Sequence, residues 1–142
     1  MKPEQFIREQ GLPEVKRLLG EAPKHSQFVI PCLDGEMYFS QREDDGKWFK
    51  WSNGYSKWLE YFGKCNPLDL AYSLSDLKRL VESVDLVELL GGIDIAKRKV
   101  KMAEFNGFLL ISVPVENGFG DIYAQKVERA IRDHESIYGG GE

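Results

Sequence analysis

Residues 36–62 read EMYFSQREDDGKWFKWSNGYSKWLEYF and decide the fold of the first half of the chain. The runs 36–42 and 47–51 are rich in aromatic residues and are typical of strands. Asp45-Gly46 marks the turn between them, and Asn53-Gly54 is the strongest short hairpin signal in the sequence. Residues 55–61 are open between a fourth strand and a helical turn, and we favour the strand. The stretch therefore predicts consecutive antiparallel strands.

Helical patterns lie on both sides of this stretch. Helices are expected at 3–10 and 12–19, before a strand at 27–30 and a tight turn at Asp34-Gly35. After a connector at 63–71, a helix capped by Ser73 or Ser75 should run to residue 90, and a second should occupy 93–102. A strand at 108–113, a loop at 117–120 and a helix at 121–136 complete the chain.

This order predicts an α+β fold with a twisted, mainly antiparallel sheet and helices packed on it. The expected division places an ααβββ(β) unit at 1–72 and an ααβα unit at 73–142. Whether the two units share one core stays open at this level.

The two halves resemble each other at a fixed offset of 81 residues. Residues 6–30 align without a gap on 87–111, with identities at Gly11 and Gly92, Lys16 and Lys97, Arg17 and Arg98, Ala22 and Ala103, and Ile30 and Ile111. One interpretation is two diverged copies of a helix-turn-helix-strand unit. The other is that two amphipathic segments share a pattern that forces most apolar matches.

The composition bounds the function classes. The chain has 142 residues, 42% of them hydrophobic and 30% charged, with a net charge of -4. This acidic balance weighs against nucleic-acid binding, which needs a basic surface. The sequence has no apolar signal segment and no apolar run long enough for a membrane helix. Cys32 and Cys65 form no CxxC pair, so we expect a cytoplasmic protein with reduced thiols.

Residues suited to catalysis are few. His25 and His134 lie in different halves, no cysteine or histidine group has zinc spacing, and no glycine-rich phosphate loop is present. The acidic residues 43–45 are typical of a solvated turn. An enzyme would need a deep pocket that joins His25, Cys32 and a carboxylate. We expect a protein that is not an enzyme and that holds no cofactor or metal.

Aromatic residues are concentrated where strands are predicted. Nine of the 17 aromatics, including all three tryptophans, fall within residues 38–62. Strand alternation puts Phe49 and Trp51 on one face, and Trp48 and Lys50 on the other. Either the protein covers both faces, or one aromatic face is open to a protein partner. The candidate partner-binding residues are Trp48, Lys50, Trp51, Tyr55 and Trp58.

An alternative function is nucleic-acid binding. The lysines among the rings would suit stacking on a single strand. The most basic stretch of the chain, which supplies the alternative site, comprises Lys97, Arg98, Lys99 and Lys101. Asp94 at the start of the same predicted helix would repel phosphate, so this use is the less favoured one.

Several segments resemble small accessory proteins of lambda-like phages and of prophages of enteric bacteria. They are IREQGLPEVKRLLGEAP at 7–23, the following FVI, the hairpin with WFKW, and SLSDLKRLVESVDLVELLGGIDIAK at 73–97. The resemblance implies an origin in a phage early or accessory region and a place in the bacterial cytoplasm. It implies no catalytic residues, and it favours a partner that is a host or phage protein. The oligomeric state stays open.

Overall fold

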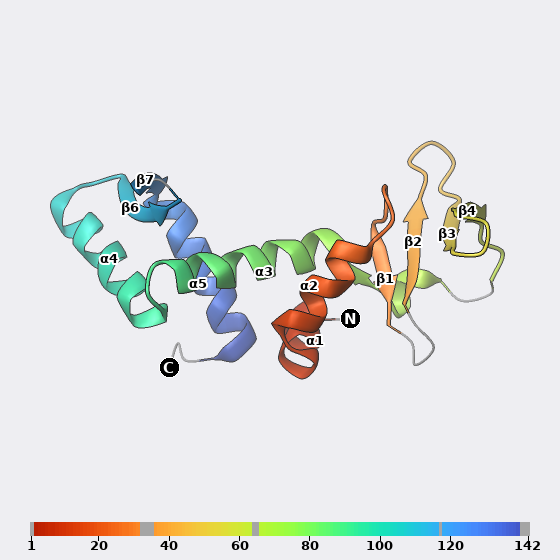
Figure 1. Cartoon of the computed structure of the whole chain (residues 1–142), viewed down its shortest axis with the longest axis horizontal. Coiled ribbons are helices and arrows are strands. Elements are labelled where there is room, and N and C mark those ends of the chain that lie inside the picture. The colour runs from red at the N-terminus through yellow and green to blue at the C-terminus, as the bar shows by residue number, and fades with distance from the viewer. Residues whose placement is uncertain (1, 32–35, 64–65, 117, 140–142) are drawn as a thin grey trace. The chain divides into compact units, whose positions relative to one another are not determined.

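The computed structural model describes residues 2–31, 36–63, 66–116 and 118–139 (Figure 1). Helices and antiparallel strands alternate as predicted, so the α+β fold class is confirmed. The chain divides into two compact units, Met1–Lys78 and Arg79–Glu142. The division falls within helix α3 (Leu74–Leu89), a few residues beyond the boundary expected between 72 and 73.

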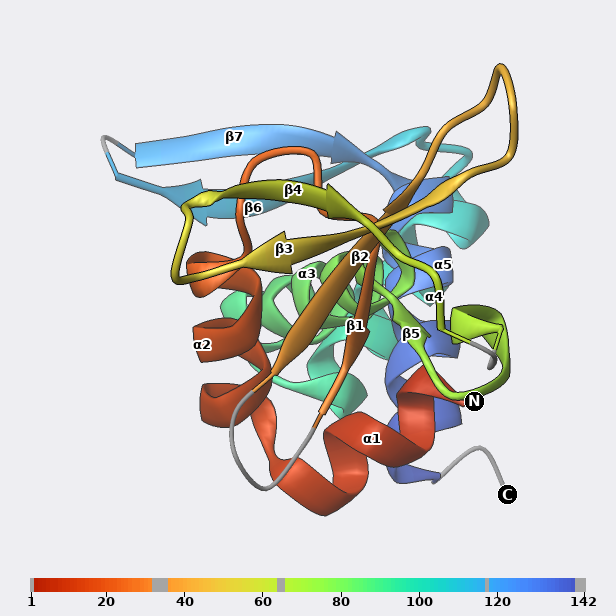
Figure 2. The same ribbon diagram turned by 90° about the vertical axis from the view of Figure 1, so that its right-hand side faces the viewer.

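Unit 1 contains two helices and a sheet. The helices are α1 (Pro3–Gln10) and α2 (Leu12–Glu21). The described residues of the unit form a five-stranded antiparallel sheet in the order β4-β3-β2-β1-β5 (Figure 2). Its strands are β1 (Phe28–Ile30), β2 (Met37–Gln41), β3 (Trp48–Ser52), β4 (Lys57–Glu60) and β5 (Tyr72–Ser73), with a 3-10 turn at Pro67–Asp69 before β5. The four strands predicted between 27 and 61 are all present.

The helices of unit 1 lie along the face of the sheet that carries Val29 and Tyr38. These two residues are paired across β1 and β2, and both are buried. The Tyr38 hydroxyl donates a hydrogen bond to the Leu18 carbonyl of α2 over 2.8 Å. The ring of Phe6 in α1 stacks on Tyr72 of β5 with 4.5 Å between the ring centroids. Burial raises the pKa of Tyr38 to about 12.

The hairpin between β3 and β4 forms with a different turn from the one expected. The strands pair as far as Ser52 and Lys57, which leaves a four-residue loop in place of a two-residue Asn-Gly turn. The left-handed residue of this loop is Ser56, at φ 51°. Asn53 instead accepts a hydrogen bond from the Trp51 indole over 3.1 Å. The Asn-Gly signal therefore located the hairpin correctly and assigned the wrong turn type.

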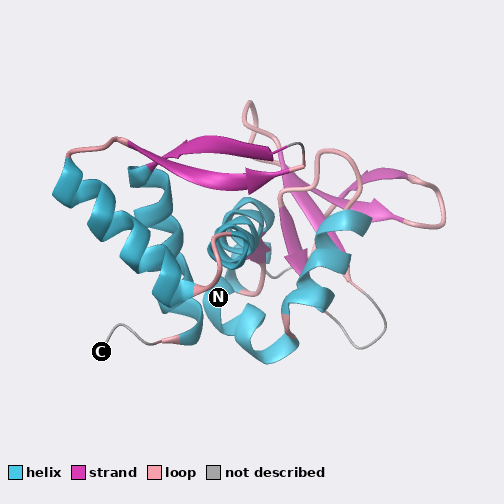
Figure 3. Ribbon diagram, turned by 60° about the vertical axis from the view of Figure 1, so that its left-hand side comes forward, coloured by secondary structure: helices cyan, strands magenta, loops and turns pink. Residues whose placement is uncertain are grey.

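Unit 2 packs a short ribbon of strands on helices (Figure 3). Beyond α3 it contains α4 (Ile93–Asn106), β6 (Leu110–Val115), β7 (Gly118–Tyr123) and α5 (Ala124–Tyr138). In the described part of this unit β6 and β7 form a two-stranded antiparallel sheet. Its inward face is buried against α4 and α5 in a core that includes Val100, Ile111, Val113, Val127 and Ile131.

Strand β7 was not predicted. The sequence indicated a loop at 117–120 and a helix starting at residue 121, whereas the chain pairs along β6 up to Tyr123 and α5 starts at Ala124. Gly120 belongs to the strand because it makes room for close packing. A β-carbon there would lie 3.2 Å from a methyl group of Val115. Cys32, Cys65, Asn117, the turn at Asp34-Gly35 and the tail from 140 to 142 lie outside the described residues.

In the alignment of residues 6–30 on 87–111, the structural similarity lies at the start of one helix in each half. Gly11 and Gly92 both have positive φ, 85° and 111°, and each immediately precedes a helix, α2 or α4. The packing diverges after the first turn, because Leu18 of α2 is buried while Lys99, its counterpart in α4, is only half-buried. The shared geometry is thus local to the turn, and both interpretations of the resemblance stand.

Substitution of Gly11, which precedes α2, tests this turn geometry, and Gly20 inside α2 serves as the control. Gly11→Ala should lower the free energy of unfolding of unit 1 by about 1–3 kcal/mol, because φ 85° with ψ 155° is a region that side chains avoid. Gly20→Ala, inside the same helix and with no atom within 4 Å of the added carbon, should raise it by about 0.5–1 kcal/mol. Urea unfolding followed by tryptophan fluorescence reports unit 1 alone, since all three tryptophans belong to it. Equal effects of the two substitutions would contradict the assignment.

The buried phenol of Tyr38 should make unit 1 sensitive to alkali. Its pKa is about 12 in the folded protein and about 10 in an unfolded chain, so folding favours the protonated form. This contribution to stability is complete below pH 10 and is lost as the pH rises from 10 to 12. Tyr38→Phe should flatten that part of the pH dependence measured by urea unfolding. Ile7→Val, a core substitution without an ionisable group, should lower stability and leave the slope as in the wild type.

Candidate functional site

The five candidate partner-binding residues do not form one surface. In the register of β2, β3 and β4, Lys50 lies between Phe39 and Leu59 on one face of the sheet, together with Trp48. Trp51 is paired with Trp58 on the opposite face. Tyr55 stands in the loop at the end of the hairpin, 74% exposed. The predicted alternation of Trp48 and Trp51 is confirmed, and the candidate set mixes residues of both faces.

Trp51 and Trp58 serve the framework of unit 1. Their rings meet edge to face with 5.5 Å between centroids. The Trp58 indole donates a hydrogen bond to the Lys24 carbonyl over 3.1 Å, which ties β4 to the segment between α2 and β1. Each indole N–H has a partner within the unit and each ring is half-buried, so these two tryptophans stabilise the sheet.

The other face of the sheet carries a cluster of rings. The ring centroids of Phe28 and Trp48 are 5.5 Å apart. The rings of Phe39 and Tyr61 meet edge to face, with 5.2 Å between their centroids. Phe39 is almost fully buried, whereas its ring neighbours are half-buried. In Figure 2 neither α1 nor α2 lies in front of β2, β3 and β4. We name this surface the aromatic face; it comprises Phe28, Met37, Phe39, Trp48, Lys50, Leu59 and Tyr61.

A depression of about 490 Å³ adjoins the ring cluster. Met37, Lys50, Leu59 and Tyr61 contribute to its lining from the aromatic face. Exposed Phe62 and residues of the β3–β4 turn also line it, and so do parts of Glu36, Trp51 and Glu60. The last three alternate with the residues of the aromatic face, and the carboxylates of Glu36 and Glu60 form ion pairs with Arg17 and Lys47. On the aromatic face the depression thus combines apolar side chains with the one basic residue Lys50.

Tyr61 and Leu59 are members of this face that the sequence analysis did not select. A β-carbon on Gly63 would lie 2.0 Å from the Tyr61 hydroxyl, so the glycine leaves the ring free to lie across the backbone. The sequence signal for Tyr61 was Gly63, a glycine two residues after an aromatic residue at the end of a predicted strand. Leu59 carried no signal of its own, since a lone leucine in a strand more often belongs to a core.

Two of the four basic residues proposed for the alternative function, Lys97 and Lys101, lie beside acidic residues. Lys97 forms an ion pair with Glu135 of α5 over 3.0 Å. Lys97 and Lys101 border a shallow depression of about 390 Å³ between α4 and α5, which Arg132 and the carboxylates of Glu104 and Glu128 also line. Arg98 and Lys99 lie at other positions around α4. The arrangement is a mixed-charge helix surface, which does not favour a run of phosphates.

Residues with catalytic or metal-binding chemistry are dispersed. His25 belongs to unit 1 and His134 to unit 2. The Nδ1 atom of His134 is buried without a hydrogen-bond partner, and burial lowers the pKa of this imidazole. Across the described residues, acidic and histidine side chains nowhere gather in threes around a possible metal position. Asp45 of the acidic turn accepts a hydrogen bond from the Lys47 amide over 3.0 Å, which lowers its pKa.

The helices of the described chain are too short or too polar to cross a membrane. Comparison of the chain with protein-family models, with curated proteins and with solved structures finds no match. The interpretation of the aromatic face therefore rests on the contacts, burial and charges of its own residues.

The framework role of Trp58 can be measured. Trp58→Phe removes the indole bond to Lys24 and should lower the free energy of unfolding of unit 1 by about 1 kcal/mol. Trp58→Ala should lower it by about 2–3 kcal/mol, because the half-buried ring also packs on Trp51. Tyr55→Ala, at the exposed loop, should change it by less than about 0.5 kcal/mol. Urea unfolding monitored by circular dichroism compares the three, and a Trp58→Ala variant as stable as the wild type would refute the assignment.

Proposed function

We propose that this chain is a non-enzymatic protein-binding module that holds a host or phage protein on its aromatic face. The observation that carries the proposal is the one-sided cover of the sheet. Contacts from α1 and α2 reach one face through Leu18 and Phe6, while the ring cluster and the 490 Å³ depression lie on the other. Rings that offer contact area at low entropic cost are the usual anchors of protein interfaces.

The chemistry of the depression indicates the kind of segment it would accept. Apolar surface from Met37, Leu59 and Tyr61 suits a large apolar side chain of the partner. Lys50 adds one basic side chain to the same lining, so a partner with a polar or acidic group next to its apolar anchor would find a complementary charge. Such a surface favours a folded protein partner over a phosphate backbone.

The proposed setting is the bacterial cytoplasm, with the chain acting as a phage or prophage accessory protein. Its support is the resemblance of residues 7–23 and 73–97 to such proteins.

A paired comparison tests the proposed surface. The wild type, a Lys50→Glu/Leu59→Asp variant and a Lys101→Glu/Leu89→Asp variant are immobilised and exposed to a nuclease-treated lysate of an enteric bacterium. The second variant makes the same charge changes on exposed residues of unit 2. Quantitative mass spectrometry should find a protein retained by the wild type and the control and reduced at least tenfold on the first variant.

The purified partner then gives the direct measurement. Its dissociation constant, determined by biolayer interferometry, should rise at least tenfold for Lys50→Glu/Leu59→Asp while both variants keep wild-type circular dichroism. A partner lost equally by both variants, or by neither, would contradict the proposed site. Salt-sensitive retention of single-stranded DNA that Lys101→Glu abolishes would favour the nucleic-acid alternative.

A further inference from the structure

The outward side of the β6–β7 ribbon is an apolar surface on unit 2. The strand register places Leu110 opposite Tyr123, Ser112 opposite Asp121, and Pro114 opposite Phe119. These pairs alternate with the buried residues Ile111 and Val113, so they share the face directed away from α4 and α5. We name this surface the ribbon face; Asp121 is the one charged residue among these six.

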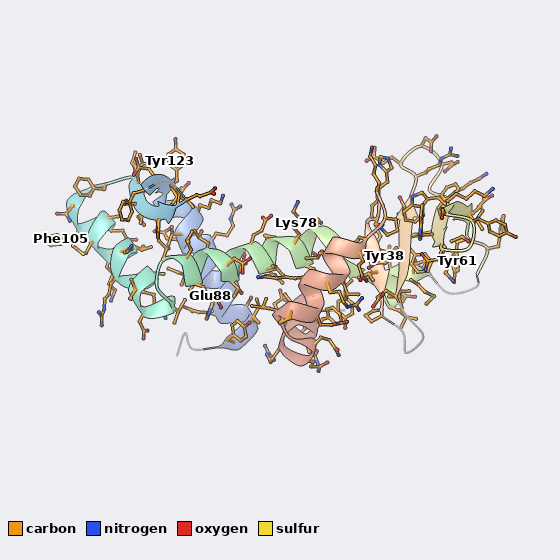
Figure 4. The ribbon with its side chains drawn as sticks, viewed as in Figure 1. Tyr38, Tyr61, Lys78, Glu88, Phe105 and Tyr123 are labelled. Carbon is orange, nitrogen blue, oxygen red and sulfur yellow. The ribbon has the colours of Figure 1, made fainter. Side chains whose placement is uncertain are left out.

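The ribbon face continues onto the end of α4. Met102, Phe108, Leu110 and Ser112 line an apolar depression of about 240 Å³, whose rim also carries Lys99. Large apolar side chains along this path are mostly exposed: Met102 65%, Phe108 63%, Leu110 45%, Phe119 79% and Tyr123 67%. Figure 4 shows Tyr123 beside the ribbon, while Phe105 lies at the end of α4.

The size of this surface matches half of a specific interface. With roughly 200 Å² for a fully exposed large side chain, the exposed fractions amount to about 600 Å². Two such surfaces bury about 1,200 Å², which is the lower end of stable protein–protein contacts. An apolar patch of about this size is at the upper end of what monomers expose, and such patches often mark contact sites.

The ribbon face is complementary to itself. Phe119 projects near the tip of the ribbon, whereas the 240 Å³ depression lies at its base. Glu116 follows β6 at the tip, and Lys99 stands on the rim of the depression at the base. A two-fold axis that lies between two ribbon faces, perpendicular to the strands at the level of Ser112 and Asp121, places the tip of one copy over the base of the other. Phe119 then lies over the base of the partner's ribbon, at Tyr123 and near the depression, and Glu116 lies at the end of the partner that carries Lys99, a residue of opposite charge.

We propose that the chain forms a two-fold symmetric dimer in which the ribbon faces of two copies pack against each other, tip on base. The axis brings the two Asp121 carboxylates toward each other at the centre, which opposes association. With the modest area, this sets an expected dissociation constant in the micromolar range. The dimer does not depend on the aromatic face, so either proposal can fail while the other holds.

Sedimentation equilibrium of the full chain between 1 and 200 μM tests the dimer. The wild type should pass from monomer to twice the monomer mass across this range. Phe119→Glu should raise the dissociation constant at least tenfold, because it places a charge in the apolar contact. Tyr55→Glu, an equally drastic change on an exposed aromatic of unit 1, should leave the constant within twofold. Circular dichroism of both variants checks that they are folded.

Charge reversal tests the tip-on-base orientation. Lys99→Glu and Glu116→Lys, each alone at low salt, should weaken self-association severalfold by placing like charges together. An equimolar mixture of the two variants should restore dimers, since every contact then joins opposite charges.

Three results would overturn the proposal. A wild type that stays monomeric at 200 μM would remove the dimer. A dimer unaffected by Phe119→Glu, or one weakened equally by Tyr55→Glu, would move it away from the ribbon face. A mixture of the charge variants that associates no better than either alone would refute the tip-on-base packing.

Discussion

Strand alternation gives every sheet two faces, and in each unit the helices bury one of them. In unit 1 the buried face is held to α2 by the Tyr38 hydroxyl bond to the Leu18 carbonyl. In unit 2 it is the inward side of the ribbon, where Ile111 and Val113 join the core of α4 and α5. Every surface with a functional interpretation follows from this constraint, because the face left over also carries large apolar side chains.

The aromatic face and the ribbon face, which the helices do not bury, differ in how far their apolar side chains are covered. On the aromatic face the rings cover one another: Phe28 packs on Trp48 and Phe39 on Tyr61, so the cluster is half-buried within the unit. The ribbon face has no comparable cluster, and Phe119 and Tyr123 stay mostly exposed. Burial of apolar area is the main favourable contribution to association. Association with a second ribbon face would therefore bury more apolar area. The aromatic face would bury apolar area with a partner that fits its depression.

The strands of unit 1 could be predicted because turn residues separate short aromatic runs, and because the period of two assigned Trp48 and Trp51 to opposite faces. The choice between the faces could not be predicted. It depends on where α2 packs, through Leu18 and Tyr38, and on the Trp58 bond to Lys24, which joins residues 34 positions apart. Strand β7 was missed for a related reason. Gly118 and Gly120 are typical of a loop in the local sequence. They belong to a sheet only because they pair with Val115 and Val113.

The distribution of charge also favours contact through apolar surfaces over contact with nucleic acid. Lys97 of the most basic helix is neutralised by Glu135, and the depression beside it is lined by both signs of charge. Lysines that already face carboxylates release few counterions when they meet a phosphate, so they supply little of the affinity that nucleic-acid binding requires. An apolar contact has no such dependence on the balance of charge. The net charge of -4 then acts against non-specific association, while ring packing and shape select the partner.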